Sequence, residues 1–230
     1  MFNRIATAAL VLCVAACAAP RPAAPPAPSR PTAVLQTLPA RGSYQIDSAD
    51  SELRVLVYRA GPLAGLGHNH VMVNRAMTGL VQVGGDVSAS SFSLNVPVDE
   101  FVVDDARARS EEGGDFSGDI SEDARAGTRS NMLSAAVLNG LKYPSIVVKS
   151  VALAGTPAAL SADLEVSVAG HSVRISTPLI LQGDAHRMTA TGSVQLRQTA
   201  LGLAPYSLMH GALQVQDALL VKFKFVVAAN

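Results

Sequence analysis

The sequence predicts an all-β domain whose antiparallel strands close into a barrel with one helical insertion at about residues 104–141. From Ser43 onward, apolar and polar residues alternate with a period of two, as in strands that bury one face. Glycine, aspartate and proline turns separate these stretches. Between Asp104 and Leu141 the alternation is lost and charged residues concentrate. A closed barrel removes exposed strand edges, and a flat β-sandwich is the alternative.

The strands can be placed in chain order from this alternation. It is clearest at residues 91–98, 160–168, 187–197 and 213–227. Further strands are expected at 44–47, 53–59, 71–83, 146–153 and 173–182. In the insertion, Ser110–Asp115 is expected to form a polar loop. Residues 120–139 fit one or two helices, because apolar residues from Met132 recur at i, i+1, i+4 and i+5.

The interior of such a barrel can be either a filled core or a cavity for one elongated ligand. The candidate inward residues are mostly small or aliphatic, and aromatic residues make up only 4% of the chain, which favours a cavity. Eleven residues are expected to line it: Phe92, Leu94, Val96, Ala162, Leu164, Val166, Ile175, Leu179, Ala190, Gly192 and Val194.

The N-terminus has the pattern of an export signal over residues 1–16. A basic residue, Arg4, precedes the apolar run Ile5–Ala16, which is shorter than the roughly 20 residues that span a bilayer. The run ends Val14-Ala15-Ala16-Cys17, which resembles the bacterial lipobox, in which the cysteine is acylated. Ala at position 18 then favours the outer membrane, by resemblance to lipoprotein sorting signals. An ordinary signal peptide, which would give a soluble periplasmic protein, is the alternative.

Residues 17–42 are expected to be a tether between this anchor and the barrel domain, residues 43–230. Seven of the 24 residues from Ala18 to Arg41 are proline, which favours an extended, semi-rigid chain. The other cysteine, Cys13, lies in the signal, so the mature chain has no pair of thiols for a disulfide.

The balance of charge argues against a nucleic-acid binder. The chain has 18 Lys and Arg against 18 Asp and Glu, and no tryptophan. It therefore lacks the basic excess and the aromatic stacking platforms that such proteins use.

Five phrases, in order along residues 43–228, resemble one family. They are Tyr44–Ser48, Thr78-Gly79, Leu141–Ile146 with Lys149-Ser150, Leu164–Val173 and Gln198–Gly202. Together they resemble the YceI-like family of bacterial exported proteins. The resemblance implies a lipocalin-like barrel with an apolar tunnel that holds a polyisoprenoid chain, and a role in carrying or storing lipid without a cofactor. The chain departs from the usual pattern at Leu63–His70 and in a longer acidic segment at about 104–126.

Histidines are the residues most suited to chemistry in this sequence. His68 and His70 are two apart, which places both rings on one face of an extended chain. With His171, they are candidates for the tunnel mouth or for contact with a polar lipid head. A metal site on His68 and His70 is the alternative, and it needs further ligands. These could come from His171, His186, His210, Asp99, Glu100, Asp104 or Asp105.

No catalytic role is expected. The sequence contains no G-x-S-x-G elbow and no phosphate-binding glycine loop. The adjacent pairs Asp104-Asp105 and Glu111-Glu112 are interpreted as solvated surface. The predicted function is an envelope-anchored protein that binds a polyisoprenoid or another long-chain lipid. The alternatives are a periplasmic metal-binding protein that uses His68 and His70, and a structural or stress-response lipoprotein without a ligand.

Overall fold

The computed structural model describes residues 34–184 and 186–229. Contacts divide the chain into two compact units, and the described residues belong to the second, which begins at Thr32. The predicted signal, Cys17 and the first part of the tether lie outside the described residues. No helix in the described part is long and apolar enough to cross a membrane.

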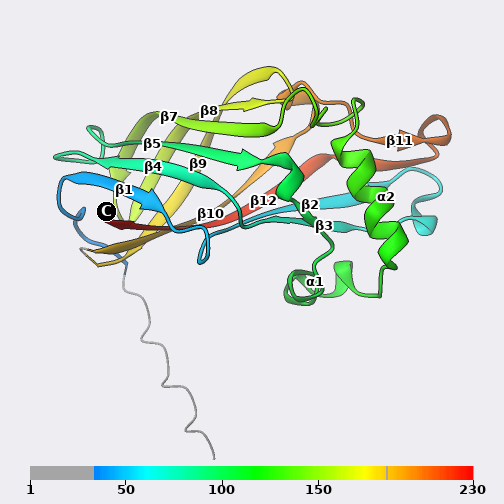
Figure 1. Ribbon diagram of the computed structural model, residues 1–230, viewed down its shortest axis with the longest axis horizontal. Coiled ribbons are helices and arrows are strands. Elements are labelled where there is room, and N and C mark those ends of the chain that lie inside the picture. Colours follow the sequence, from blue (N-terminus) through cyan, green and yellow to red (C-terminus); the bar gives the residue numbers. More distant parts are fainter. Residues whose placement is uncertain (1–33, 185, 230) are drawn as a thin grey trace, which may run out of the picture. The chain divides into compact units, whose positions relative to one another are not determined.

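Eight antiparallel strands close into a barrel, which confirms the predicted fold class (Figure 1). Their order around the barrel is β1-β4-β5-β7-β8-β9-β10-β12, and β12 pairs with β1 to close the ring. The strands are β1 (Gly42–Ile46), β4 (Thr78–Val83), β5 (Ser91–Pro97), β7 (Ser145–Thr156), β8 (Ala159–Val168), β9 (His171–Gly183), β10 (Arg187–Arg197) and β12 (Leu213–Ala229).

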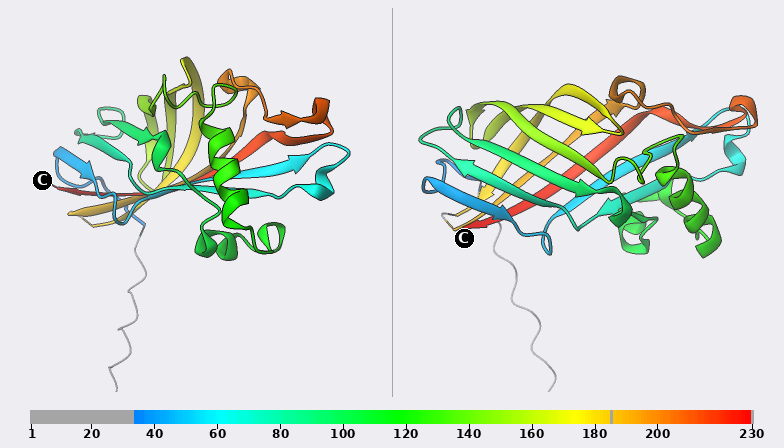
Figure 2. Two further views of the ribbon diagram at one scale, coloured as in Figure 1. Left: turned by 45° about the vertical axis from the view of Figure 1, so that its right-hand side comes forward. Right: turned by 45° about the horizontal axis from the view of Figure 1, so that its top comes forward.

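Strand β12 is long enough to pair with two strands along one edge. Its last residues pair with β1, and the stretch from Gln214 to Lys224 pairs with β2 (Glu52–Ala60). Strand β2 continues the sheet to β3 (His70–Asn74) and β6 (Val102–Val103). The barrel is therefore closed through β1 and β4 at one end and flares along β2, β3 and β6 at the other (Figure 2).

The alternation of residues decides which face of each strand is buried. In β8, Leu160, Ala162, Leu164, Val166 and Val168 are buried, whereas the residues between them are exposed or half-buried. Successive side chains on a strand point to opposite faces, so the apolar set faces the barrel interior. The sequence pattern thus fixes the inward face of this strand.

The segment predicted as one strand at 71–83 forms two strands, β3 and β4, which pair with different neighbours. Arg75, Ala76 and Met77 make the corner between them. The buried side chain of Asn74 accepts a hydrogen bond from the Ala76 amide at 3.0 Å and donates one to the Pro97 carbonyl at 2.7 Å. These bonds satisfy backbone groups that lose their partners where the strand pairing is interrupted. A period-2 pattern does not reveal such an interruption.

The helical insertion contains α1 (Ala106–Glu112) and α2 (Glu122–Leu133), with short 3₁₀ turns η2 (Val98–Glu100) before them and η3 (Gly114–Phe116) between them. The prediction of a polar loop at Ser110–Asp115 is wrong in its first half, because α1 extends to Glu112. The Asp105 and Ser121 side chains cap α1 and α2 by accepting bonds from Ala108 and Ala124.

Helix α1 and η3 pack against β2 and β3 on the side away from the barrel interior. Ala108 and Phe116 join Leu56, Val71 and Val73 in one buried cluster. An ion-pair cluster around Arg54 extends this contact. Arg54 pairs with Glu52, Glu111 and Glu112, and Glu112 also pairs with Lys222. Hydrogen bonds from Arg54 and Arg107 hold the pKa of Glu111 at about 2.

The solvated-surface interpretation of the two acidic pairs is wrong for one member of each. The side chain of Glu112 is only 5% exposed, and Asp104 is completely buried. Both carboxylates have cationic partners, which offset the loss of water.

The last part of the predicted tether packs on the barrel. Val34 forms a β-bridge with Gln182, and the Leu35 amide donates to the Leu181 carbonyl at 2.9 Å. Leu35 and Leu38 pack against the buried cluster at the closed end. The folded domain therefore begins before the predicted boundary at residue 43, because these leucines interrupt the proline- and alanine-rich composition.

Candidate functional site: the barrel cavity

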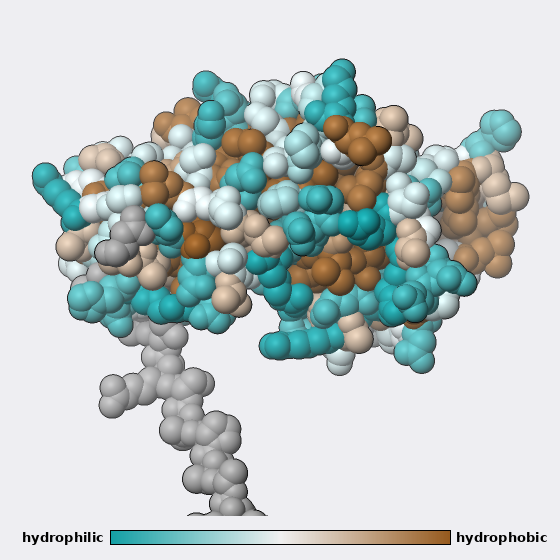
Figure 3. All heavy atoms as spheres, viewed as in Figure 1, coloured by the Kyte–Doolittle hydropathy of each residue, from teal (hydrophilic) through white to brown (hydrophobic). Residues whose placement is uncertain are grey.

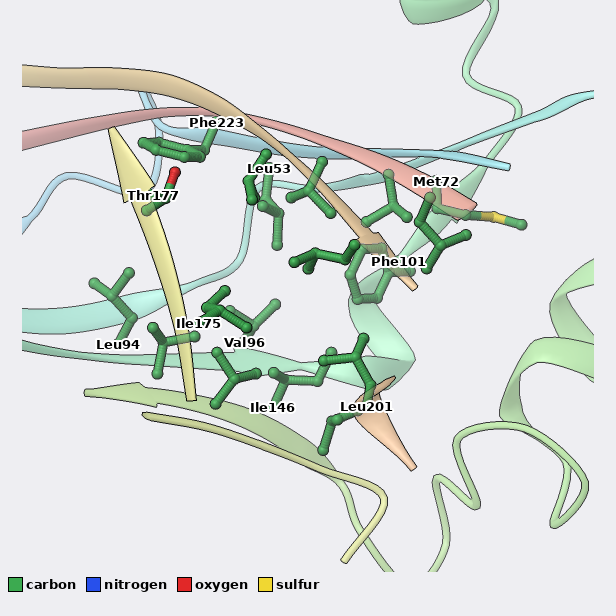
Figure 4. A pocket seen from close by; sticks show the side chains of 18 of the residues that line it. Leu53, Met72, Leu94, Val96, Phe101, Ile146, Ile175, Thr177, Leu201 and Phe223 are labelled. Atoms are coloured by element: carbon green, nitrogen blue, oxygen red, sulfur yellow. The ribbon is translucent and has the colours of Figure 1, made fainter. Parts of the chain in front are cut away.

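The barrel encloses a cavity of about 560 Å³. All eight barrel strands contribute to its wall, together with β2, β3 and α2. Figure 4 shows side chains from several strands, among them Leu53, Ile146 and Ile175, converging on this space. The volume lies within the range of about 300–1,000 Å³ that is usual for small-molecule sites.

The structure places nine of the eleven predicted lining residues on the cavity wall. Their contact with a lipid stays a prediction. The nine are Phe92, Leu94, Val96, Leu164, Val166, Ile175, Leu179, Ala190 and Val194.

The other two, Ala162 and Gly192, are not part of the wall. Ala162 is fully buried in an apolar cluster with Leu153 and Leu160. Gly192 pairs with Phe223 across β10 and β12, and a Cβ at Gly192 would lie 2.5 Å from the Phe223 ring. The aromatic ring thus covers the glycine, and Phe223 supplies the cavity surface there.

Several wall residues were not identified from the sequence. Phe223 and Phe225, two apart on β12, stack with ring centroids 5.1 Å apart. Leu53, Val55 and Val57 extend the wall along β2. Both strands have the same period-2 signal as β5, β8 and β10, so the alternation could have placed them.

Polar groups on the wall gather at the flared end. Apart from Ser90 and Thr177, the polar lining residues come from the ends of β2 and β10, the starts of β3 and β12, the 68–70 and 206 turns, and α2. We call this polar rim the mouth. It comprises Arg59, His68, His70, Thr128, Asn131, Gln198, Tyr206 and Gln214.

His68 and His70 lie together on the mouth, with ring centroids 6.4 Å apart. The His70 Nδ1 atom is 2.7 Å from Oδ2 of Asp104, so the carboxylate fixes the orientation of this imidazole. A ring held at Nδ1 leaves Nε2 as its second polar atom. No local pattern predicts this contact, because 34 residues separate the partners.

Asp104 is the most strongly held carboxylate near the mouth. Its carboxyl accepts from His70, from the Val71 amide at 3.0 Å and from Arg109 at 2.7 Å. Burial favours the neutral form, but these contacts outweigh it and lower the pKa of Asp104 below its usual value. Asp104 also has a φ of 55°, a left-handed conformation that is uncommon outside glycine.

His171 lies outside the cavity wall, in contrast to His68 and His70. It begins β9, is exposed, and packs against Gly202. A Cβ at Gly202 would lie 2.5 Å from Cγ of His171, and Gly202 has a φ of 76°. His171 is therefore a surface residue beside this turn, and the structure does not bring it together with the other two histidines at the cavity.

The described residues contain no group of three or more His, Cys, Asp or Glu side chains that could hold a metal ion. The further ligands considered from the sequence, including His186 and His210, therefore do not combine with His68 and His70 into such a group.

The fold and the cavity define a lipocalin-like protein: a closed eight-stranded antiparallel barrel with an apolar interior. No protein-family model matches the chain, and no curated protein matches it. Solved structures do match the chain in fold. BcnA of Burkholderia cenocepacia aligns with a TM-score of 0.57 at 12% identity, over 79% of this chain and 98% of BcnA.

The YceI protein of Campylobacter jejuni aligns with a TM-score of 0.50 at 7% identity, over 67% of this chain and 81% of that protein. A mutant of the same protein gives 0.51 over the same shares. The chain thus has the YceI-like fold, and the resemblance predicted from the sequence is confirmed at the level of the fold. At 7–12% identity this likeness concerns the fold alone.

Proposed function

We propose that this protein binds a long apolar lipid in its barrel, with a polyisoprenoid as the expected class, and sequesters or carries that lipid in the periplasm. The observation that supports the proposal is the cavity itself, whose wall is apolar from the closed end to the mouth. Catalysis and a resident cofactor form no part of the proposal.

The size of the cavity supports a chain-like ligand. An engineered cavity of about 150 Å³ accommodates benzene, so 560 Å³ corresponds to on the order of twenty carbon atoms. Each buried CH₂ contributes about 0.8 kcal/mol, so such a chain gains enough to exceed the cost of association, about 4–15 kcal/mol. Branched aliphatic side chains line most of the wall and suit a branched isoprenoid.

The polar groups favour one orientation of the ligand. An apolar tail would lie toward the closed end, against residues such as Val83, Leu181 and Met188. A polar head would then meet Arg59, His68 and His70 at the mouth. Burying an unpaired polar head among aliphatic side chains is unfavourable, which opposes the reverse orientation.

We also propose that residues 1–16 are removed and that acylated Cys17 tethers the protein to the outer membrane. This part depends on the export pattern of residues 1–16, on Val14-Ala15-Ala16-Cys17 and on Ala18. The proline-rich tether would act as a spacer that holds the folded domain off the membrane.

Native mass spectrometry tests the lipid proposal. The chain that begins at Thr32 is suitable, because every apolar cluster of the barrel lies within that unit. We expect bound masses that dissociate on extraction and are identified as long-chain lipids, and no stoichiometric metal. A barrel that is empty after gentle isolation and does not bind added polyisoprenoid would refute the proposal. A stoichiometric zinc or copper that is lost in a His68→Asn/His70→Asn variant would favour the metal-binding alternative.

A further inference from the structure

Two loops project beyond α2 at the flared end of the barrel (Figure 1). The first, residues 61–69, joins β2 to β3 and contains η1 (Ala64–Leu66). The second, residues 204–212, contains β11 (Ser207–Leu208) and η5 (Met209–Gly211). We call these two loops the tips.

The tips are joined to each other at their bases. The Leu63 amide donates to the Ala212 carbonyl at 2.8 Å. Glycine permits this approach, since a Cβ at Gly61 would lie 2.6 Å from the Ala212 carbonyl oxygen, and Gly61 has a φ of 90°. The tips therefore present one continuous surface.

That surface exposes large apolar side chains. Leu66 is 74% exposed, Met209 is 69% exposed and Leu208 is 45% exposed. Leu66 and Leu208 also belong to the cavity wall. Hydrophobic atoms gather at this end of the molecule in Figure 3. Leu66 and Leu208 thus connect the apolar wall of the cavity with the exposed surface of the tips.

The backbone of the second tip has an unusual conformation. Met209, His210 and Gly211 all have positive φ, at 52°, 56° and 90°. Each non-glycine residue in this region costs about 1 kcal/mol or more, and such residues concentrate at functional sites. This conformation accompanies an exposed Met209 side chain, where burial would be the ordinary outcome for methionine.

The tips contain no carboxylate. There is no Asp or Glu between Glu52 and Asp86, nor between Asp184 and Asp217. His68 and His210 are the titratable groups of the tips, and the strand ends beneath them hold Arg59, His70 and the ion pair of Arg197 with Asp217 at 4.0 Å.

Two carboxylates approach from the helical insertion. Asp104 is buried against Arg109 and His70. Asp115 lies beside the base of the first tip, where its backbone carbonyl accepts from the Asn69 side chain at 2.8 Å. Asp104 is paired with Arg109 and Asp217 with Arg197, so Arg59 beside the tips is the group that complements an anionic partner.

We propose that the tips dock on an anionic lipid bilayer, with Leu66, Leu208 and Met209 entering the boundary between headgroups and acyl chains. Exposed apolar side chains with a cation beside them favour interfacial binding to an anionic membrane. The mouth of the cavity would then open onto the membrane, so that an apolar ligand could pass between bilayer and barrel without crossing water. This docking goes beyond the proposed ligand binding and does not depend on the identity of the ligand.

Vesicle co-flotation tests the docking. The chain from Thr32 is mixed with vesicles of phosphatidylcholine alone or with part of it replaced by phosphatidylglycerol. We expect binding that is stronger on the anionic vesicles and that decreases with salt. Leu66→Gln/Met209→Gln is expected to weaken it at least about tenfold, because two apolar side chains no longer transfer from water. The matched control is Leu141→Gln/Ile180→Gln, which removes two exposed apolar residues outside the tips without changing charge.

Tryptophan fluorescence reports insertion directly, because the chain has no tryptophan of its own. Met209→Trp is expected to shift its emission to the blue when anionic vesicles are added, and Leu141→Trp is expected not to shift. The proposal would be overturned if the emission of Met209→Trp does not shift. It would also be overturned if Leu66→Gln/Met209→Gln and the control Leu141→Gln/Ile180→Gln bind anionic vesicles equally well.

A second copy of the chain is the competing occupant of this surface. Concentration-dependent dimerisation without vesicles, abolished by Leu66→Gln/Met209→Gln, would overturn membrane docking in favour of self-association. Lipid occupancy of Met209→Gln, whose side chain lies outside the cavity wall, is measured by native mass spectrometry and separates the two proposals. If the variant loses vesicle binding while its barrel stays fully occupied by lipid, the tips act in docking and not in ligand binding. If the barrel is empty but the protein still binds vesicles, only the ligand-binding proposal is refuted.

Discussion

Filling the cavity from inside tests ligand binding most directly, and Ala190→Phe is the change we favour. Ala190 lies on the cavity wall in β10, opposite Leu181 of β9 and Phe225 of β12. A benzene-sized group occupies about 150 Å³, so the added ring would take about a quarter of the 560 Å³ cavity.

The expected loss of affinity follows from the volume removed. Excluding even two CH₂ groups of the ligand costs about 1.6 kcal/mol at 0.8 kcal/mol each, which exceeds a tenfold change in Kd. We therefore expect Ala190→Phe to weaken lipid binding at least about tenfold, measured by competition with a fluorescent lipid. Overpacking itself costs about 1–3 kcal/mol of stability, so the free energy of unfolding is measured alongside.

The matched control is Ile180→Phe. Ile180 is on β9, pairs with the residue next to Ala190, and is 45% exposed on the outer face. It adds a ring without filling the cavity and is expected to leave affinity unchanged. If Ala190→Phe folds normally and binds lipid as well as the wild type, the cavity is not the binding site.

Three further predictions concern the anchor, the mouth and the buried carboxylate. Cys17→Ser is expected to abolish acylation and release the protein from the membrane fraction, and a fatty-acid label that persists in this variant would refute the lipobox. His70→Asn is expected to lower the free energy of unfolding by about 1.5–3 kcal/mol, the scale of a hydrogen bond to a charged group, whereas His68→Asn stays within about 0.5 kcal/mol; urea denaturation distinguishes them. Asp104→Asn is expected to cost about 3–5 kcal/mol at neutral pH, because Arg109 stays buried without its partner. Since the pKa of Asp104 is lowered by folding, its contribution is complete above about pH 4 and is lost as pH falls through the folded-state value, so the variant should lose less stability on acidification.

The positions that look suitable for cavity filling in the sequence alone are not suitable in the structure. Gly192→Leu would place Cβ 2.7 Å from the Pro178 carbonyl oxygen and 2.5 Å from the Phe223 ring. Ala162 is fully buried beneath neighbours that line the cavity and is not itself part of the wall. Both variants would test packing, and a loss of binding in either would not identify the ligand site.

Much of the barrel could be predicted because period-2 alternation is a local signal. The strand predicted at 187–197 has the bounds of β10, and that predicted at 91–98 differs from β5 by one residue. The same signal places nine residues on the cavity wall, since a strand with one buried face has only two choices of orientation.

The rest depends on contacts between distant residues. The corner at Arg75–Met77 is set by the bond from Asn74 to the Pro97 carbonyl, which the local alternation does not contain. Asp104 seemed to be a surface residue because an acidic neighbour follows it. Its burial depends on His70 and Arg109, and no sequence period links residue 104 to residue 70.

The polarity of the cavity from one end to the other follows from how β12 is shared. One edge of β12 pairs with β1 through its last residues only. The closed end of the barrel is therefore formed by short strands, and Leu35 and Leu38 pack there. Strand β2 occupies the rest of that edge and directs the β2–β3 turn outward, which brings Arg59, His68 and His70 to the mouth. One 17-residue strand thus places the apolar closed end and the polar mouth at opposite ends of a single cavity. A ligand with an apolar chain and a polar head would therefore meet complementary surroundings in only one direction, with its head toward the tips.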